Sequence, residues 1–438
     1  MSGTKLDRGL PSRHVTEGLN TALNRIYFHA MGLSQEDLER PIVGVASAWD
    51  GASASGSMPL RGATKAQGGV WAAGGMPRQF ATIADDVAEE SLVGRELIAD
   101  SVELTVRGHS YDGLLGVTSS VAGMAGLMMV MCRLDVPAAL VPLVGPAVES
   151  GADALALAAV AHELGLAAPL PVPLPDGLEP LLGPAHAAGA AVMAALDAGR
   201  TARSGVDAGS LGRAAAALVA RGGNPDLMLH LLAIASECGV EADPVGLVAA
   251  MDAAAVSVRW CGGDLAPAGA LLTVDAELRP VESAARVFED PDAALEFASA
   301  DWPEGTAIVV RGQGPVGGPG LTRLDRLCDG LAALPKPADA TLITDGRLRP
   351  VPGLLGFSCV GPEAALDGPL AALRDGDPVA FSPDESALSA APSGPATAPS
   401  PPRRSARLEK YAAVVGPAAG GAVTHPGARA ESVRYAEL

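Results

Sequence analysis

Aromatic residues, lysines and paired cysteines are all scarce in this sequence of 438 residues. Aromatic residues make up only 3% of the chain whereas hydrophobic residues make up 48%, so we expect a core built mainly from alanine, leucine and valine. Lysine occurs at only four positions, and the net charge is −19. Because nucleic acids and anionic membrane surfaces both require clustered basic residues, neither is predicted as a partner.

The sequence also shows no segment typical of those that direct export or membrane insertion. The amino terminus has no apolar stretch typical of a signal peptide, and no uninterrupted apolar run approaches the about 20 residues of a membrane span. The five cysteines are scattered and do not show the CxxC spacing of a zinc or redox site. These absences predict a folded cytoplasmic protein with free thiols.

The clearest pattern in the chain covers residues 95–137 and begins with RELIADSVE. Apolar residues at helical spacing predict a half-buried helix over 96–106, and the short apolar run at 114–117 predicts a buried strand. In open α/β sheets, ligands bind just beyond the carboxyl ends of the strands. Ser119 and Ser120, which follow this strand, therefore stand where chemistry is expected.

Apolar runs elsewhere predict the remaining architecture. Further buried strands are expected at 41–46 and 138–145, and alanine-rich helices are expected to continue to about residue 254. Beyond them, short apolar runs between turn-rich loops predict a compact β-rich domain with flanking helices. Its expected strands lie at 270–274, 307–311 and 340–344, with a helix at 291–299.

The predicted fold class is α/β, with an N-terminal parallel α/β sheet domain and a C-terminal β-rich, barrel-like domain. We expect these domains to cover residues 1–262 and 263–390. A Pro/Ser/Ala-rich linker follows at 391–404, and a helix and tail occupy 405–438.

Several of these segments resemble the dihydroxy-acid dehydratases and the related 6-phosphogluconate and sugar-acid dehydratases. The matching motifs are RELIADSVE, RLDVP, PIVGVASAW, LHLLAIA, GDLAPAGALL, RVFED, the glycine-rich loop at 312–320 and TLITDGR. The resemblance runs from about residue 13 to about residue 425. It implies a lyase of the hydro-lyase type that acts on a small-molecule acid and forms a homodimer.

The positions that carry this family's chemistry are altered. Three cysteines hold an iron–sulfur cluster in the family, and the matching places here fall on Ser55, on Ser120 and near Val148. A serine hydroxyl is a poor ligand for an iron–sulfur centre, which binds thiolates. The resemblance therefore leads us to expect no iron–sulfur cluster and no dehydration by the family's mechanism.

The magnesium ligands implied by the resemblance are mostly replaced as well. Val121 and Ala122 stand where the family has an aspartate and a modified lysine. Gln313 stands in place of a glutamate and loses its negative charge. Asp85 or Asp86 matches the remaining magnesium aspartate, but their acidic run is also typical of a solvated helix start. A magnesium site and a helix start are therefore alternatives, and no cofactor is expected.

Arg349 stands where the family has a serine proposed as the base. A guanidinium cannot be deprotonated in an ordinary protein site, so Arg349 cannot inherit that role. Together with Arg347, it is suited to binding a carboxylate or a phosphate as a clamp. His230, in the LHLLAIA helix, is predicted to be a hydrogen-bonded core histidine rather than a catalytic one.

Two functions from different classes remain open. In the first, a repurposed cleft acts on a small hydroxy or oxo acid without a cluster, by a non-standard mechanism suited to specialised metabolism. In the second, the chain is a catalytically silent relative that binds a metabolite or a partner subunit. The candidate catalytic residues are Asp85, Asp86, His109 and Ser120, and the candidate substrate-binding residues are Ser55, Ser119, Gln313, Arg347 and Arg349.

Each candidate also has a purely structural explanation. His109 closes a turn in that case, and Arg349 pairs with a surface acid. We lean towards the enzyme, because polar and charged groups converge on the expected site. The clamp hypothesis requires Arg349 to face the region of Ser120, and an Arg349 that points to solvent contradicts it.

Overall fold

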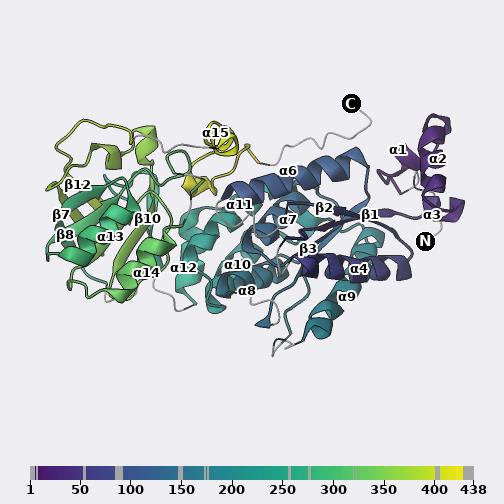
Figure 1. Ribbon diagram of the computed structural model, residues 1–438, viewed down its shortest axis with the longest axis horizontal. Coiled ribbons are helices and arrows are strands. Elements are labelled where there is room, and N and C mark those ends of the chain that lie inside the picture. Colours follow the sequence, from purple (N-terminus) through teal and green to yellow (C-terminus); the bar gives the residue numbers. More distant parts are fainter. Residues whose placement is uncertain are drawn as a thin grey trace.

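The computed structural model describes residues 5, 8–52, 56–83, 92–146, 151–171, 174, 177–254, 258–274, 278–318, 320–321, 323–399 and 405–427. The molecule is elongated, with the N-terminal domain towards one end and the C-terminal domain at the other (Figure 1). Among the predicted site residues, Ser55, Asp85 and Asp86 lie outside the described residues, as does Val148.

Four parallel strands form the sheet of the N-terminal domain, in the order β2-β1-β3-β4. They are β1 (Ile42–Ser47), β2 (Met76–Ala81), β3 (Gly113–Thr118) and β4 (Ala138–Pro142). Every residue of β1 and β3 is buried, as expected for parallel strands that are covered by helices on both faces. The strands predicted at 41–46 and 114–117 are confirmed, and the strand predicted at 138–145 is confirmed over 138–142.

Two layers of helices cover this sheet. Val43 and Val45 face α4 (Ser57–Ala72) and α9 (Leu178–Asp197), whereas Ile42 and Ala46 face the opposite layer, because successive side chains of a strand alternate. On the opposite side lie α6 (Leu92–Gly108) and α7 (Val121–Leu134), and four further helices pack on them and on one another: α8 (Ala152–Glu163) and α11 (Met228–Cys238) on α7, α10 (Ala208–Ala220) on α8, and α12 (Pro244–Asp252) on α10.

Helices α6 and α7 approach each other closely at Gly126. A Cβ atom at this position would lie 2.6 Å from the carbonyl oxygen of Arg95 and 3.0 Å from the Cβ of Ile98. Glycine is therefore required sterically for the observed packing of the two helices. The apolar spacing that predicted a helix over 96–106 correctly identified the central part of α6.

The C-terminal domain is an eight-stranded mixed sheet in the order β12-β11-β7-β8-β9-β10-β6-β5. Backbone hydrogen bonds from Leu388 N to Gly262 O (2.7 Å) and from Leu265 N to Leu388 O (3.1 Å) bring its two edges together. The sheet is therefore nearly closed, which confirms the predicted barrel-like domain. Its strands are β5 (Val258–Cys261), β6 (Gly269–Val274), β7 (Val281–Phe288), β8 (Thr306–Val310), β9 (Thr341–Thr344), β10 (Leu355–Gly361), β11 (Pro378–Ser382) and β12 (Ala387–Ala390).

Helices α13 (Pro291–Ala300) and α14 (Asp325–Ala333) pack on this sheet through a separate apolar cluster. Strand β5 pairs within the same sheet, so the sheet begins before the expected domain boundary at 263. The described part of the expected linker is attached to the domain, because Arg374 Nη2 donates to Pro395 O (2.8 Å). After the linker, α15 (Ala406–Ala412) contacts α6 of the N-terminal domain.

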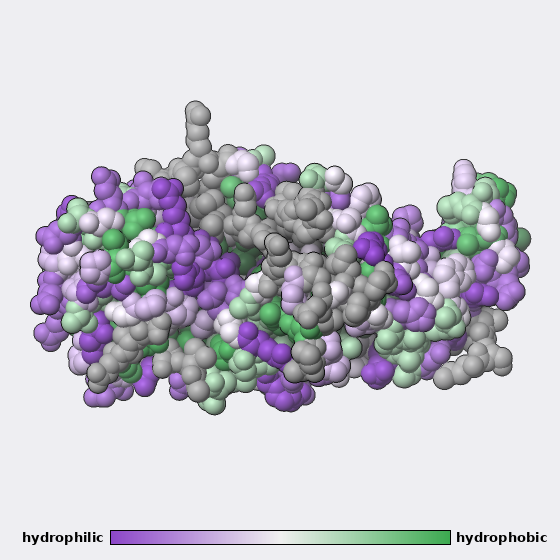
Figure 2. All heavy atoms as spheres, turned by 60° about the horizontal axis from the view of Figure 1, so that its bottom comes forward, coloured by the Kyte–Doolittle hydropathy of each residue, from purple (hydrophilic) through white to green (hydrophobic). Residues whose placement is uncertain are grey.

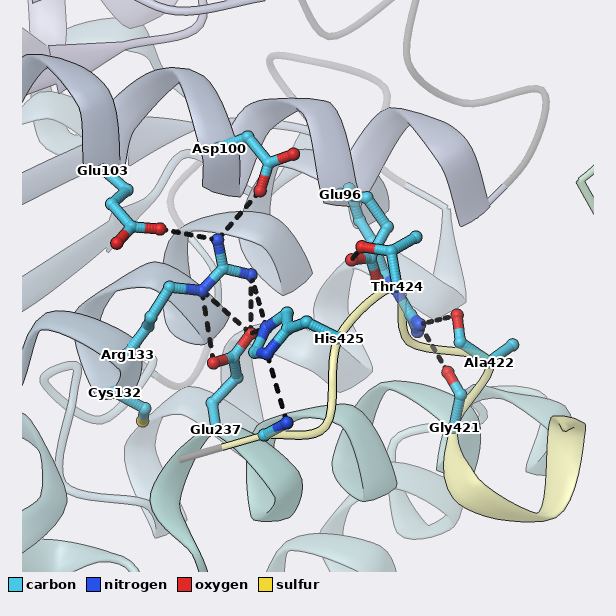
Figure 3. A network of polar contacts seen from close by, with 12 residues as sticks. Glu96, Asp100, Glu103, Cys132, Arg133, Glu237, Gly421, Ala422, Thr424 and His425 are labelled. Atoms are coloured by element: carbon cyan, nitrogen blue, oxygen red, sulfur yellow. Dashed lines mark hydrogen bonds and ion pairs between the residues drawn. The ribbon is translucent and has the colours of Figure 1, made fainter. Parts of the chain in front are cut away.

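The segment 421–427, which follows α15, is bound between helices of the N-terminal domain (Figure 3). The side chain of Arg95 is fully buried and donates to Gly421 O and to Ala422 O (3.0 Å). His425 Nε2 bonds to Glu237 Oε1 (2.8 Å), and the same carboxylate accepts from Arg133 Nη2 (2.7 Å). The arginine of the RELIADSVE motif thus anchors the chain's C-terminal segment rather than a ligand.

An arm of short helices precedes β1. It contains α1 (Arg13–Thr16), the 3₁₀ turn η1 (Leu19–Thr21), α2 (Ala22–Ala30) and α3 (Gln35–Glu39). The arm projects from the end of the molecule that is opposite the C-terminal domain (Figure 1). No helix in the described ranges is long and apolar enough to cross a membrane.

Candidate functional site

The strand order of the parallel sheet reverses at β1, which lies between β2 and β3. In open α/β sheets, the position beyond the carboxyl ends of the strands at such a reversal is where ligands bind. Ser119 and Ser120 follow β3 directly and lie at this edge of the sheet. Their position after the carboxyl end of a buried strand is as predicted.

Ser120 also serves as the N-cap of α7. Its Oγ accepts a hydrogen bond from Gly123 N (2.9 Å), and the residue is buried. Ser119 beside it is half-buried. An N-cap serine typically contributes about 1 kcal/mol to helix stability. The hydroxyl of Ser120 therefore has a structural role of its own.

The donors described at this edge do not fit an iron–sulfur cluster. Of the three positions matched to cluster cysteines, only Ser120 is described, and its oxygen caps a helix. Burial raises the pKa values of Cys261, Cys328 and Cys359 to about 12, 11 and 12, so these thiols of the C-terminal domain stay protonated near neutral pH. Among the residues that the structure describes, no three His, Cys, Asp or Glu side chains form a group that could hold a metal ion.

A group of charged side chains connects the two domains near the edge of the sheet where Ser119 and Ser120 lie. Asp153 lies in the first turn of α8, beyond the carboxyl end of β4, and accepts from Arg323 Nη1 of the C-terminal domain (2.7 Å). Burial opposes the ionisation of Asp153, but hydrogen bonds from Asn224 and Arg323 outweigh it and lower its pKa. The backbone also joins the domains here, because Leu92 N at the start of α6 donates to Gly320 O (3.0 Å).

Asp226 lies at the centre of this group. It belongs to the 3₁₀ turn η4 (Pro225–Leu227), and its side chain is fully buried. Arg347 Nε donates to its Oδ2 (2.8 Å), while its Oδ1 has no hydrogen-bond partner and lies 3.7 Å from Arg323 Nη1. One buried carboxylate of the N-terminal domain thus faces two arginines of the C-terminal domain.

Arg347 is the predicted substrate-binding residue that the structure places at this junction. Only 9% of its side chain is exposed. Nε is bound to Asp226, and within the described ranges the two terminal nitrogens have no acceptor. A guanidinium with two free parallel donors is suited to a carboxylate or a phosphate.

His230 lies near the same arginines and is neutral. Burial, followed by the charges of Arg95, Arg347 and Arg323, lowers its pKa well below the ordinary value. Its Nδ1 accepts a hydrogen bond from Arg95 Nη1 (3.2 Å), which confirms the predicted hydrogen-bonded core position.

Arg349 does not join Arg347 in a clamp. Its guanidinium forms ion pairs with Asp329 and with Asp325 (3.8 Å), both on the outer helix α14. Arg347 instead pairs with Asp226 of the N-terminal domain. The two arginines, although two residues apart, have partners in different parts of the molecule, and the purely structural explanation fits Arg349.

His109 lies at the other end of the sheet from the serines. It follows the end of α6, is exposed, and stacks on Tyr111 with ring centroids 5.4 Å apart. Because six residues of β3 at about 3.3 Å each lie between this turn and Ser119, His109 and Ser120 cannot contact one ligand. Their expected cooperation in catalysis has no support in this geometry.

Gln313 is held by its own domain. Its Nε2 donates to Glu289 O (3.0 Å), and its backbone N donates to Asp345 Oδ1 (2.8 Å). Asp345 is buried, and its Oδ2 accepts from Gly312 N and Ala364 N as well. These bonds fix the start of the glycine-rich loop, and the side chain of Gln313 satisfies a local carbonyl group.

Sequence reasoning missed Asp153, Asp226 and Arg323. The two aspartates are in segments matched as scaffold, and their pairing with arginines of the other domain leaves no local pattern.

A separate apolar groove of about 330 Å³ runs along β4, residues 165–171 and the alanine-rich side of α9. It lies along the outer edge of the sheet and shares none of the charged residues of the junction.

The fold and the junction together define a two-domain α/β protein whose candidate site lies between a parallel sheet and a barrel-like sheet. Residues 40–168 match the family model "Dihydroxy-acid/6-phosphogluconate dehydratase N-terminal", and residues 250–422 match the corresponding C-terminal model. The chain belongs to the dihydroxy-acid/6-phosphogluconate dehydratase family.

Similar curated proteins cover nearly the whole chain. A dihydroxy-acid dehydratase 2 of Bradyrhizobium diazoefficiens is 32% identical, with 99% of each chain covered. Dihydroxy-acid dehydratase of Dinoroseobacter shibae is 32% identical with 98% of each chain covered, and dihydroxy-acid dehydratase 2 of Mesorhizobium japonicum is 30% identical with 98% of this chain and 96% of the relative covered. The first alignment extends over 571 positions, so part of it faces gaps in this chain of 438 residues. The protein is a shortened member of the family.

Proposed function

We propose that this dehydratase-family protein binds a small polar acid at the junction of its two domains and does not carry out the cluster-dependent dehydration of its family. The observation that carries the proposal is Arg347. Its side chain is nine-tenths buried, is fixed through Nε on Asp226, and has two terminal nitrogens without an acceptor in the described part of the chain. A second guanidinium is near, because Arg323 Nη1 lies 3.7 Å from Asp226 Oδ1.

A catalytically silent binding protein is the reading that the described residues support best. Arg349 and Gln313 are engaged in contacts within the C-terminal domain, and His109 is at the opposite edge of the sheet. His230 is buried and neutral, with its Nδ1 already accepting from Arg95. The described carboxylate beside Arg347, that of Asp226, is itself held between Arg347 and Arg323, which suits it to fixing the guanidinium for binding.

Turnover of the bound acid is the second candidate, favoured by the location of Ser119 and Ser120 at the strand-order reversal. In this case Arg347 holds the carboxylate, and the hydroxyls of Ser119, Ser120 and Ser55 donate hydrogen bonds. Asp85 or Asp86 transfers the proton in a lyase-type reaction on a hydroxy or oxo acid. We propose no iron–sulfur cluster in either case, and a magnesium ion only if Asp85 and Asp86 supply its ligands.

The protein is proposed to be cytoplasmic, which its free thiols support, and to form a homodimer. The net charge of −19 supports the absence of a nucleic-acid partner. These proposals concern the setting of the protein and do not depend on whether the bound acid is converted.

Thermal-shift and calorimetric titration against hydroxy acids, oxo acids and sugar acids tests the binding proposal. One class of acid should stabilise the wild type, and Arg347→Gln should weaken it by about 2 kcal/mol or more, roughly 30-fold in Kd. Arg349→Gln is the matched control, because it removes a nearby arginine that is paired on the surface, and its Kd should equal that of the wild type. Equal affinity of Arg347→Gln, with unchanged circular dichroism, contradicts the proposal.

Incubation of the stabilising acid with the protein, followed by NMR of the products, separates the two candidates. Conversion that is lost in Ser119→Ala supports the enzyme, and an unchanged acid supports the silent binder. Anaerobic purification with stoichiometric iron and sulfide would overturn both candidates and restore the family's reaction.

A further inference from the structure

Two cysteines of the N-terminal domain meet where α11 packs on α7. Cys132 lies in the last turn of α7 and is fully buried, and Cys238 is the last residue of α11. Both belong to the same apolar cluster, and their thiols are hydrogen-bonded to each other. We call these two residues the thiol pair. The other three cysteines lie in the C-terminal domain and have no such contact with a thiol among the described residues.

An ion pair beside the thiol pair fixes the two helices to each other. Arg133 follows Cys132 in α7, and Glu237 directly precedes the other cysteine in α11. Arg133 Nη2 lies 2.7 Å from Glu237 Oε1, and Cys132 lies beside this contact (Figure 3). Arg203 also holds the end of α7, because its Nε donates to Cys132 O (2.7 Å). The two sulfur atoms are therefore brought together by contacts that do not involve the thiols themselves.

The two thiols of the pair differ in protonation and exposure. The hydrogen bond with Cys238, followed by burial, raises the pKa of Cys132 well above its ordinary value, so that Cys132 stays protonated near neutral pH. Cys238 is only half-buried, whereas the other four cysteines are buried. Hydrophilic side chains are interspersed with hydrophobic ones over the described surface shown in Figure 2, so water and small polar solutes have access to it. An oxidant in solution therefore reaches Cys238 before Cys132.

We propose that the thiol pair is an oxidation site, at which a peroxide attacks Cys238 first and a reversible disulfide with Cys132 follows. In the first step the O–O bond of hydrogen peroxide breaks and an S–O bond forms, which gives a sulfenic acid on Cys238 and one water. The Cys132 sulfur then attacks the Cys238 sulfur, and its proton leaves with the hydroxyl group as a second water. The two thiols lose two electrons and two protons, which the peroxide accepts. Neither cysteine belongs to the junction, so oxidation of the pair and binding of an acid are independent properties.

Peptide mapping of the oxidised full chain is the first test. The reduced, folded protein is treated with hydrogen peroxide, the excess is removed with catalase, and free thiols are alkylated after unfolding. We expect a cross-linked peptide that contains Cys132 and Cys238, an intact mass lower by two hydrogen atoms, and recovery of both thiols with a reductant. The three cysteines of the C-terminal domain should be alkylated as in the untreated protein. Peptides of Cys132 and Cys238 that remain unlinked, as thiols or as higher oxidised forms, overturn the proposal.

Two serine variants with unchanged circular dichroism test the order of attack. In Cys132→Ser the sulfenic acid of Cys238 has no partner and should be trapped by dimedone. In Cys238→Ser the remaining thiol of the pair is buried and protonated, and it should give roughly tenfold less dimedone adduct. Cys328→Ser is the matched control, because it removes a buried cysteine outside the pair, and its disulfide should form as in the wild type. Equal labelling of the first two variants overturns the assigned order of attack.

Urea unfolding tests whether the cross-link fits the native structure. The thiol pair is separated by about 100 residues of sequence, and a cross-link that closes a loop of this length restricts the unfolded chain. The oxidised protein should therefore have a urea midpoint of the N-terminal domain that is higher by about 1 M or more, and a reductant should restore the starting value. An unchanged or lower midpoint in the cross-linked protein would show that the disulfide distorts the packing of α11 on α7, and would overturn the site.

Discussion

Replacing Glu237 by glutamine is the most direct test of how segment 421–427 is held. The side chain of Glu237 is only 1% exposed, and Arg133 and His425 converge on it. Arg133 Nη2 lies 2.7 Å and His425 Nε2 lies 2.8 Å from Glu237 Oε1. Glutamine has nearly the same shape, so the variant removes the charge without creating a cavity.

The expected cost follows from the burial of this pair. Removing one partner of a buried ion pair costs about 3–5 kcal/mol, because the other charge stays buried. Arg133 keeps Asp100 Oδ1 at 2.8 Å and Glu103 Oε2 at 2.9 Å, so we expect the lower end of that range, about 3 kcal/mol. Glu103→Gln removes a more exposed acid from the same arginine and should cost about 1 kcal/mol or less.

Urea unfolding and limited proteolysis together provide the assay. A chain with two domains need not unfold in one step, so the transition of the N-terminal domain is followed separately by hydrogen exchange in α6 and α7. Glu237→Gln should lower the midpoint of this transition and speed cleavage near Thr424, whereas Glu103→Gln should change neither by a comparable amount. Equal effects of the two variants would refute the reasoning.

Three further predictions concern protonation, packing and thiol reactivity. The bond to Glu237 raises the pKa of His425, so the stabilisation by this ion pair is fully present below about pH 6.5 and is lost as the pH rises through the raised pKa. Protonation of His425 removes the hydrogen bond that its Nδ1 accepts from Gly427 N. The variant His425→Gln should abolish this part of the pH dependence of proteolysis. Gly126→Ala should destabilise the N-terminal domain by roughly 1–3 kcal/mol in urea unfolding, because its Cβ would meet Arg95 O, whereas Gly212→Ala, with open space around it, should stabilise the domain by about 0.5–1 kcal/mol. Burial and raised pKa values should keep Cys261, Cys328 and Cys359 unreactive towards a disulfide reagent at pH 8 in the native protein, and rapid labelling of any of them, identified by peptide mapping, would contradict this.

The strands of the parallel sheet could be predicted because their burial on both faces produces short, continuous apolar runs. The run Leu114–Val117 falls within β3, and its end correctly located Ser119 and Ser120. The helix α6 could be predicted in the same way from its periodic apolar side. The order of apolar and polar residues within one segment shows which of its faces are buried, and no knowledge of its partners in the fold is needed for this prediction.

The partners of the charged residues could not be predicted. Arg347 and Arg349 are two residues apart, yet one pairs with Asp226, 121 residues earlier, and the other with Asp329, 20 residues earlier. Only the packing of the two domains decides which acid each arginine meets. His109 is a different case, because a helix, a turn and a strand in succession already imply that it lies at the start of β3, away from Ser120.

The full burial of Arg95 has a consequence for the order of events during synthesis. Its acceptors Gly421 O and Ala422 O are made 326 and 327 residues after it. At a translation rate of about 5–20 residues per second, α6 therefore leaves the ribosome tens of seconds before its guanidinium can find these carbonyl groups. The parallel sheet can assemble during this interval, but the surface around Arg95 must remain hydrated until segment 421–427 arrives. The nascent N-terminal domain is therefore incompletely packed during this interval. It is accessible to chaperones and proteases for longer than a domain whose core contacts all come from its own continuous sequence.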